Sequence, residues 1–440
     1  MKKLIHLPHM NSQFLIGAIS SGSGKTTLTL GLLRALCNRG MEVQSFKCGP
    51  DYIDTKYHEL ASGSSAINLD LFLSSEKHVE KIYSRYASCS DVAITEGVMG
   101  LFDGYDKMQG SSAQVAEKLS IPVVLVLNAK SMAYSVAPIL YGFKNFHKNL
   151  NLVGVIFNMV NSESHYKFLS DACKDVDVTP FGYLPKNEGL AVPSRHLGLS
   201  IDSDFLFDKF ADNAAAFIEE HVDIEKLLQL TQKEITAISS DKEVTNSHPI
   251  LKVAVASDEA FNFMYHENIE YLKKQGLISF FSPLHDKELP EANFVYLPGG
   301  YPELYLDGLS ENTPMKKSIS EYIEKGGHLL AECGGMMYLS SSITNNEGKE
   351  YPMVGIFQQK VTMENMKLKL GYRQFEYNGL KVRGHEFHYS SASSNLNSVA
   401  KQYSAKNQPV DTKLLRYKNA IAGYTHIYWA DMDNFFDLFK

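Results

Sequence analysis

The sequence contains few of the features that mark disulfide-rich or zinc-binding proteins. It has five cysteines among 440 residues, all well separated, with no C-x-x-C pair, and it has one tryptophan. An odd number of scattered cysteines argues against a disulfide framework or a cysteine zinc site. The pattern is typical of reduced thiols, so we expect a cytoplasmic location.

Long apolar runs and an excess of positive charge are also missing. The longest apolar stretches, such as residues 121–127, have the length of a strand and are too short to span a membrane. The first ten residues include two lysines but no sustained apolar region, which is not the pattern of a signal peptide. The net charge of -7 argues against nucleic acid or an anionic membrane as a partner.

The N-terminal half shows the pattern of an α/β domain. A predicted helix at residues 26–39 follows the first of five apolar segments. These predicted strands cover residues 14–19, 43–46, 92–95, 123–127 and 153–157. Because the strands are continuously apolar and separated by helix-length segments, they predict a parallel sheet covered on both faces.

A polar stretch divides this half from a second α/β pattern. We predict a first domain at residues 1–234, a linker at 235–250 and a second domain at 251–440. The second domain begins with a strand at residue 251, and its segment 353–389 is richer in β structure. Its other predicted strands cover residues 278–281, 294–297, 328–331 and 420–425. The predicted fold is therefore α/β, with two domains that each contain a largely parallel sheet.

The first motif is a glycine-rich loop, SGSGKTT, between a predicted strand and a predicted helix. Its backbone N–H groups and the start of the helix favour phosphate binding. Lys25 can reach the terminal phosphates, and the Thr26 hydroxyl can bind Mg²⁺. The loop departs from G-x-x-x-x-G-K-[ST], because Ile19 occupies the first glycine position. The predicted nucleotide-binding residues are Gly22, Ser23, Gly24, Lys25, Thr26 and Thr27.

Two further segments follow the next strands of the first domain. KCGPDYID provides Lys47, Asp51 and Asp54 at the carboxyl end of a strand, where such sheets bind ligands. By itself this segment is equally compatible with a capped turn. TEGVMGLFDG places Glu96 at a strand end as a candidate Mg²⁺ ligand, as are Thr26 and Asp51, and Asp103 is a further candidate for the same site.

The second domain contains a predicted strand that ends at Cys333 and is followed by two glycines and a helix. This resembles a nucleophile elbow with cysteine in place of serine. We expect the helix start and a nearby histidine to lower the pKa of the thiol. Gly334 and the LPGGYPE turn, with Gly299 and Gly300, can provide the N–H donors of an oxyanion hole.

Two segments compete to provide the general base for the cysteine. His426 follows the last predicted strand, where the base is usual when the cysteine lies earlier in the chain. RGHEFHY contains His385 and His388, which could instead pack in a strand or bind substrate. We favour His426. No glutamate stands two residues after it, because that position is Tyr428.

Together these motifs resemble the cobyrinic acid a,c-diamide synthase family of the cobalamin pathway. The resemblance extends over nearly the whole chain in order. Its matching stretches are SGSGKTT, KCGPDYID, EGVMGLFDG, LPKNEGLAVPSRHLGL, AFNFMYHEN, FFSPLHDKELP, LPGGYPE, AECGGMMYL, RGHEFHYS and YTHIYWA.

The resemblance implies an ATP-dependent domain that phosphorylates a substrate carboxylate, followed by a class I glutamine amidotransferase domain. It implies glutamine hydrolysis at Cys333, with ATP and Mg²⁺ in the first domain, and amidation of the a and c acetate side chains of a corrin ring. It also implies that the missing glutamate is normal here, so that Cys333 and His426 act as a dyad. The oligomeric state stays open.

Two other interpretations stay open. A related enzyme could perform the same amidation on hydrogenobyrinic acid or nickel sirohydrochlorin, since only the macrocycle pocket differs. A non-catalytic partitioning-type ATPase uses a similar loop, but it has no need of Cys333 and His426.

Overall fold

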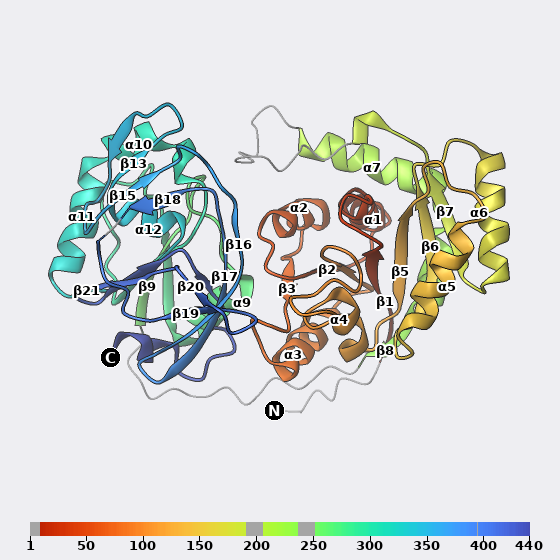
Figure 1. Ribbon diagram of the computed structural model, residues 1–440, viewed down its shortest axis with the longest axis horizontal. Helices are drawn as coiled ribbons and strands as arrows, with labels where there is room; N and C mark the ends of the chain where they lie inside the picture. Colours follow the sequence, from red (N-terminus) through yellow and green to blue (C-terminus); the bar gives the residue numbers. More distant parts are fainter. Residues whose placement is uncertain (1–8, 191–205, 236–250, 394) are drawn as a thin grey trace. The chain divides into compact units, whose positions relative to one another are not determined.

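The structure, a computed structural model, describes residues 9–190, 206–235, 251–393 and 395–440. The chain forms two compact units (Figure 1). The first contains Met1–Leu71 and Ser75–Val244, and the second contains Thr245–Lys440 together with Phe72–Ser74. Apart from Ile235, the predicted linker lies outside the described residues, so its boundaries stay a prediction.

The first unit is an α/β layer structure. Its strands are β1 (His9–Ala18), β2 (Val43–Cys48), β3 (Ile67–Leu69), β4 (Val92–Glu96), β5 (Val123–Asn128), β6 (Leu152–Asn158), β7 (Thr179–Leu184) and β8 (Gln232–Ile235). Its α-helices are α1 (Lys25–Asn38), α2 (Ile53–Ser62), α3 (Glu76–Ala87), α4 (Ser112–Leu119), α5 (Val136–Phe146), α6 (Glu163–Asp175), α7 (Phe207–His221) and α8 (Ile224–Leu230).

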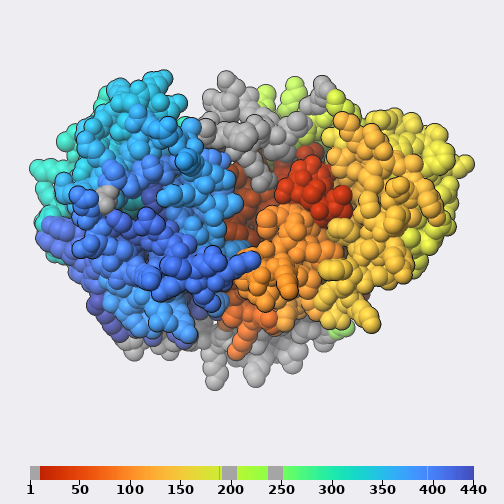
Figure 2. All heavy atoms as spheres, viewed as in Figure 1, coloured from red at the N-terminus to blue at the C-terminus, as the bar shows by residue number. Residues whose placement is uncertain are grey.

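These strands form one sheet in the order β3-β2-β4-β1-β5-β6-β7, all parallel, with β8 antiparallel to β1. Neighbouring residues of β1 contribute to opposite faces: Leu15 packs with α3 to α6, whereas Phe14 and Ile16 pack with α1, α2, α7 and α8. In Figure 2 the orange and yellow segments that include α4, α5 and α6 form the surface of this unit on the viewed face. Two covered faces explain the continuously apolar strands.

The second unit is built around another α/β sheet. Its central strands are β9 (Leu251–Ala256), β10 (Gly276–Phe281), β11 (Phe294–Leu297), β12 (His328–Glu332), β21 (Leu414–Tyr417) and β22 (Ala420–Gly423). Its α-helices are α9 (His266–Gln275), α10 (Leu306–Glu311), α11 (Thr313–Glu324) and α12 (Gly334–Leu339). The order is β10-β9-β11-β12-β22-β21, parallel except for β21.

Two smaller sheets in the second unit account for the β-rich stretch in its sequence. One contains β13 (Ser340–Thr344), β14 (Glu350–Pro352), β15 (Phe357–Thr362) and β18 (Ser391–Ser393). The other contains β16 (Lys369–Tyr377), β17 (Leu380–His388), β19 (Gln402–Ser404), β20 (Pro409–Val410) and β23 (His426–Ile427).

The last predicted strand of the second domain was too long. We predicted a strand over residues 420–425, but β22 ends at Gly423. The chain then leaves the central sheet, and His426 and Ile427 pair with His385 and Gly384 of β17 instead. This exchange of sheets brings the two histidine segments together.

Among the described residues, no helix combines the length and apolar character needed to cross a lipid bilayer.

Candidate active sites

The phosphate loop lies at the carboxyl end of β1, beside the ends of β2 and β4. Gly22 and Gly24 adopt φ values of 74° and 98°, a region open to glycine but strained for other residues. Gly24 is also tightly packed, because a Cβ added there would lie 2.2 Å from the Asn158 side chain. The loop therefore turns directly into α1, with its backbone free to approach a ligand.

A cleft of about 490 Å³ opens over this edge of the sheet. Of the predicted residues, it is lined by Gly22, Gly24, Lys25, Thr26, Thr27, Lys47, Asp51, Asp54 and Glu96. The structure thus brings together most of the residues predicted for the first site. Ser23 is not among the lining residues, and its hydroxyl donates to the Ser20 carbonyl at 2.9 Å.

Asp103 is not among the lining residues of this cleft. Its side chain is exposed and accepts a hydrogen bond from the Gly100 N–H at 3.1 Å. Asp103 therefore stabilises a local turn, and its predicted role at the metal stays a prediction. Asp51 both lines the cleft and accepts from the N–H groups of Ile53 and Asp54, which caps the start of α2.

Glu96 is the centre of a buried polar network at the bottom of the cleft. One of its oxygens accepts from Thr26 Oγ1 and from Lys47 Nζ, each at 2.8 Å. The other lies 2.8 Å from His58 Nε2. Although burial opposes its charge, Lys47 and His58 hold the pKa of Glu96 well below its usual range. Glu96 is therefore a permanent anion whose position is fixed from both sides.

Lys47 connects this anion to a second carboxylate. Its Nζ lies 2.5 Å from Asp54 Oδ2, and both side chains are almost completely buried. Burial alone would lower the pKa of Lys47, but Asp54 and Glu96 raise it above its usual value. The sequence motifs indicated Lys47, Asp54 and Glu96, but they did not reveal His58 in α2, whose partner comes from a different strand.

The same residues fit a magnesium ion. Thr26 and Glu96 present a hydroxyl and a carboxylate within 2.8 Å of each other beside the loop, and these hard oxygen donors suit Mg²⁺. Among the described residues, no group of three or more His, Cys, Asp and Glu side chains has the arrangement of a metal site.

Cys333 occupies a strained turn between β12 and α12. Its φ is 47° and its ψ is -105°, and its N–H donates to the Gly423 carbonyl at 2.7 Å. A non-glycine residue at positive φ marks the sharp turn predicted from the sequence. Burial and then Glu303 raise the pKa of the thiol above its usual value. The expectation of a lowered pKa was therefore wrong, because desolvation exceeds the contribution of the helix start.

The turn after β11 connects the cysteine segment to His426. A Cβ added at Gly299 would lie 2.2 Å from His426 Cε1, and one added at Gly334 would lie 3.1 Å from the Gly300 nitrogen. Gly300 has a φ of 154° and lies against the Ala260 carbonyl. Gly299 therefore contacts the histidine, and Gly300 contacts the first residue of the helix after Cys333, so the turn connects the two segments.

His385 and His426 are direct partners across β17 and β23. Their rings stack with centroids 4.9 Å apart. Burial lowers the pKa of His385 to about 3, and burial together with His385 lowers that of His426. Two neutral imidazoles therefore lie side by side, and each can accept a proton only if a neighbouring group stabilises the charge.

His388 belongs to a different network. Its Nε2 lies 2.7 Å from Glu386 Oε1, and its ring stacks on Tyr424 with centroids 3.6 Å apart. Glu386 also accepts from Arg373 and from Thr412. Because the His388 ring is held by Glu386 and Tyr424, we favour His426 as the base.

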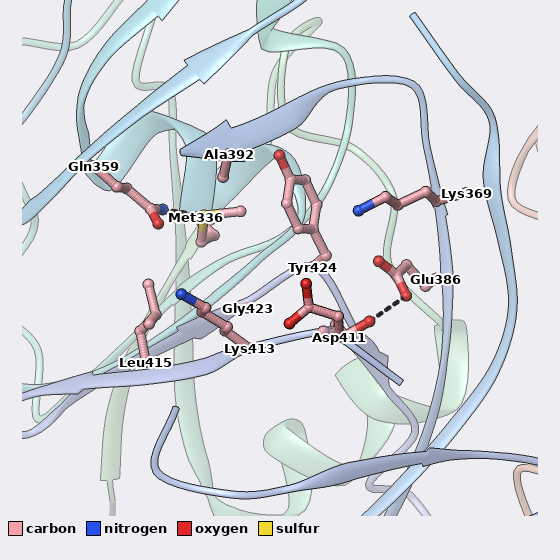
Figure 3. Close-up of a pocket in the computed structure, with 11 residues that line it drawn as sticks. Met336, Gln359, Lys369, Glu386, Ala392, Asp411, Lys413, Leu415, Gly423 and Tyr424 are labelled. Atoms are coloured by element: carbon pink, nitrogen blue, oxygen red, sulfur yellow. Dashed lines mark hydrogen bonds between the residues drawn. The ribbon is translucent and has the colours of Figure 1, made fainter. Parts of the chain in front are cut away.

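A cavity of about 200 Å³ lies next to this network (Figure 3). Figure 3 shows the Lys369 ammonium and the Asp411 carboxylate pointing toward the Tyr424 ring, with the dashed contact between Thr412 and Glu386 at one side. Met336, three residues after Cys333, and Gly423, whose carbonyl accepts from Cys333, also line it. The cavity therefore has walls from the helix that follows the cysteine and from the strand that pairs with β12, and its lining contains charges of both signs.

Comparison with known proteins identifies both halves of the chain. Residues 14–199 match the CobQ/CobB/MinD/ParA nucleotide binding domain, and residues 252–434 match the CobB/CobQ-like glutamine amidotransferase domain. The first unit is thus a nucleotide-binding domain, and the second is an amidotransferase domain.

Three curated relatives that match most of this chain are named cobyrinate a,c-diamide synthase. Cobyrinate a,c-diamide synthase of Caldanaerobacter subterraneus subsp. tengcongensis is 41% identical over 431 residues, 94% of each chain. The synthase of Listeria innocua is 41% identical over 86% of this chain and 87% of its own length. That of Clostridium acetobutylicum is 40% identical over 94% of this chain and 96% of its own length. With an amidotransferase unit and a nucleotide-binding unit in one chain, this protein is a glutamine-dependent amide ligase of cobalamin biosynthesis and belongs to the cobyrinate a,c-diamide synthase family.

Proposed function

We propose that the protein converts cobyrinic acid to its a,c-diamide with ATP, Mg²⁺ and glutamine, in the cytoplasm. The single observation that carries the proposal is the presence in one chain of the Glu96 network under a phosphate loop and of the Cys333 elbow, which is connected to His426 by the Gly299–Gly300 turn. The names of the full-length relatives support the corrinoid substrate. The five free cysteines support a reducing compartment.

In the first unit, the substrate carboxylate would attack the γ-phosphorus of ATP and release ADP. Lys25 at the end of the loop and Lys47 at the bottom of the cleft provide positive charge for the phosphates and the reacting carboxylate. Thr26 and Glu96 would hold Mg²⁺, which supplies charge neutralisation on the phosphates. The product is an acyl phosphate, whose phosphate group ammonia can displace to leave an amide.

In the second unit, Cys333 and His426 would release that ammonia. The thiol proton moves to His426 as sulfur bonds to the carboxamide carbon of glutamine, and the N–H groups near Gly300 and Gly334 stabilise the oxyanion. The carbon–nitrogen bond breaks, ammonia leaves with the proton from His426, and water hydrolyses the thioester to glutamate. Burial raises the pKa of the Cys333 thiol, so the attacking sulfur needs a base such as His426 to take its proton.

The cavity beside Tyr424 supports recognition of a free amino acid. Lys369 and Asp411 place opposite charges on its wall, and these match the α-carboxylate and the α-ammonium of glutamine. Glutamine would then extend its carboxamide toward Cys333.

Mass spectrometry of the reaction product tests the substrate. The enzyme is incubated with ATP, Mg²⁺, glutamine and one of three macrocycles. These are cobyrinic acid, hydrogenobyrinic acid and nickel sirohydrochlorin. A gain of two amides on cobyrinic acid, with slower turnover of the other macrocycles, is the expected result. Absence of turnover on every corrinoid would contradict the proposed substrate.

A further inference from the structure

Glu332, the residue immediately before the cysteine, is almost completely buried in the second unit. It is 1% exposed and is the last residue of β12. A carboxylate is rarely buried unless hydrogen-bonding partners or a task at the site hold it there. The dyad mechanism assigns it no role.

Three groups from three different segments approach this carboxylate. The Tyr296 hydroxyl of β11 donates to Oε2 at 2.7 Å, and the Ile427 N–H of β23 donates to Oε1 at 2.8 Å. His426 Nδ1 lies 4.0 Å from Oε2. The hydroxyl and the backbone N–H are hydrogen-bond donors, and a protonated imidazole nitrogen can be one. The Glu332 carboxylate is therefore surrounded by groups from which it can accept hydrogen bonds.

We propose that Glu332 is the residue that orients His426 and stabilises its imidazolium, in the role that a glutamate after the histidine fills in other amidotransferases. This inference rests on the proposed glutamine hydrolysis at Cys333. Position 428, two residues after His426, is tyrosine, so that the sequence provides no carboxylate there. Glu332 approaches the same histidine from β12, a strand of the central sheet.

The distance of 4.0 Å between Nδ1 and Oε2 is longer than a hydrogen bond. Catalytic hydrogen bonds are often long before substrate binds and shorten in the reacting complex. The Ile427 N–H belongs to the residue that follows His426, so one oxygen of Glu332 fixes the backbone of β23 while the other faces the ring.

The chemical consequence concerns the tautomer of His426. A hydrogen bond from Nδ1–H to Glu332 leaves Nε2 unprotonated and able to take the thiol proton. Once that proton arrives, the ring is a buried cation, and Glu332 supplies the opposite charge in its deprotonated form, which becomes more populated as the pH rises toward its raised pKa of about 8. Stacking on the neutral His385 cannot do so.

Glu332→Gln tests the proposal with nearly the same shape. The amide can still accept from Ile427, but it has no charge, and its NH₂ group favours the wrong tautomer of His426. We expect kcat for glutamine hydrolysis to fall by about 100-fold or more, while KM for glutamine changes less than about threefold. Amidation with an ammonium salt should stay at the wild-type rate, because the first unit is unchanged.

Tyr296→Phe is the matched control. It removes one hydrogen bond from the same buried oxygen but keeps the carboxylate, so its loss of kcat should be at least about tenfold smaller than that of Glu332→Gln. Equal losses in the two variants would overturn the proposal, since general loosening of the cluster would then explain both. Wild-type kcat in Glu332→Gln would also overturn it.

A measurement on the wild type tests the same contact without changing Glu332. With ¹⁵N-labelled histidine, NMR reports the tautomer of His426, which is assigned from the signals missing in His426→Gln. Above about pH 8, where Glu332 has lost its proton, the proposal requires Nδ1–H, and an Nε2–H tautomer there would contradict it. If the wild type itself failed to hydrolyse glutamine, the proposed function would fail, whereas the tautomer would still report on the Glu332 contact.

Discussion

At the scale of single residues, each of the two sites contains buried ionisable side chains that position its functional groups. The sequence reveals only some of these side chains. Lys47, Asp54 and Glu96 stand in recognisable motifs, and the structure brings them together. His58 and Glu332 were not predicted, although Glu332 directly precedes Cys333 in AECGG. Their partners come from other strands and helices, and no sequence spacing encodes such contacts.

Removing Lys47 should destabilise the first unit strongly. Lys47→Met leaves Asp54 and Glu96 as buried anions without their shared cation, and breaking a buried pair of this kind costs about 3–5 kcal/mol. Urea unfolding followed by circular dichroism measures the change. Lys174→Met, which removes an exposed ion pair with Asp171, is the control and should leave the transition where it is. A similar shift in both variants would contradict the buried network.

Glu332 should make the stability of the second unit depend on pH. Burial raises its pKa to about 8, whereas the unfolded chain has a pKa near the usual value of about 4.3. The folded state therefore holds a proton that the unfolded state loses, and stability falls as the pH rises from about 4.5 to 8, by at most about 1.4 kcal/mol per pH unit.

Chemical denaturation of the wild type and Glu332→Gln across this pH range isolates that contribution. The advantage of the wild type over the variant should shrink as the pH rises. An advantage that stays constant between pH 5 and pH 8 would show that Glu332 titrates normally.

At the scale of elements, the sequence predicts the two central sheets well and the accessory β structure poorly. The central strands of the first sheet are buried on both faces, so their apolar runs are easy to recognise. The β23 strand has two residues and pairs with β17 in a separate sheet. Such a short strand has no periodicity, so its position depends on tertiary pairing.

The turn after β11 should be intolerant of side chains. Gly299→Ala places a methyl group 2.2 Å from His426 Cε1, so the ring must move, and a shift of about 1 Å can cost about 100-fold in rate. Steady-state glutamine hydrolysis measures the loss.

Gly142→Ala in α5 provides the comparison. A Cβ there meets nothing within 4 Å, and alanine stabilises a helix relative to glycine by roughly 0.5–1 kcal/mol. This variant should hydrolyse glutamine at the wild-type rate and should unfold at a slightly higher denaturant concentration. Full activity in Gly299→Ala would contradict the close contact between the turn and the base.

At the scale of the whole molecule, the chain combines a site that activates a carboxylate with a site that releases ammonia. Each unit has its own sheet and its own cores, so a substitution in one site should leave the chemistry of the other intact. Glu96→Gln removes a charge from the centre of the first site. We expect it to abolish amidation with either glutamine or ammonia while glutamine hydrolysis continues. Loss of hydrolysis in this variant would show that the two reactions depend on the same residues.

The account depends most directly on Cys333 as the source of ammonia. Amide incorporation into cobyrinic acid by Cys333→Ser, measured by mass spectrometry with ATP and either glutamine or an ammonium salt, tests it. We predict two amides from ammonium at a rate close to that of the wild type and none from glutamine. Amidation from glutamine by this variant would contradict the account.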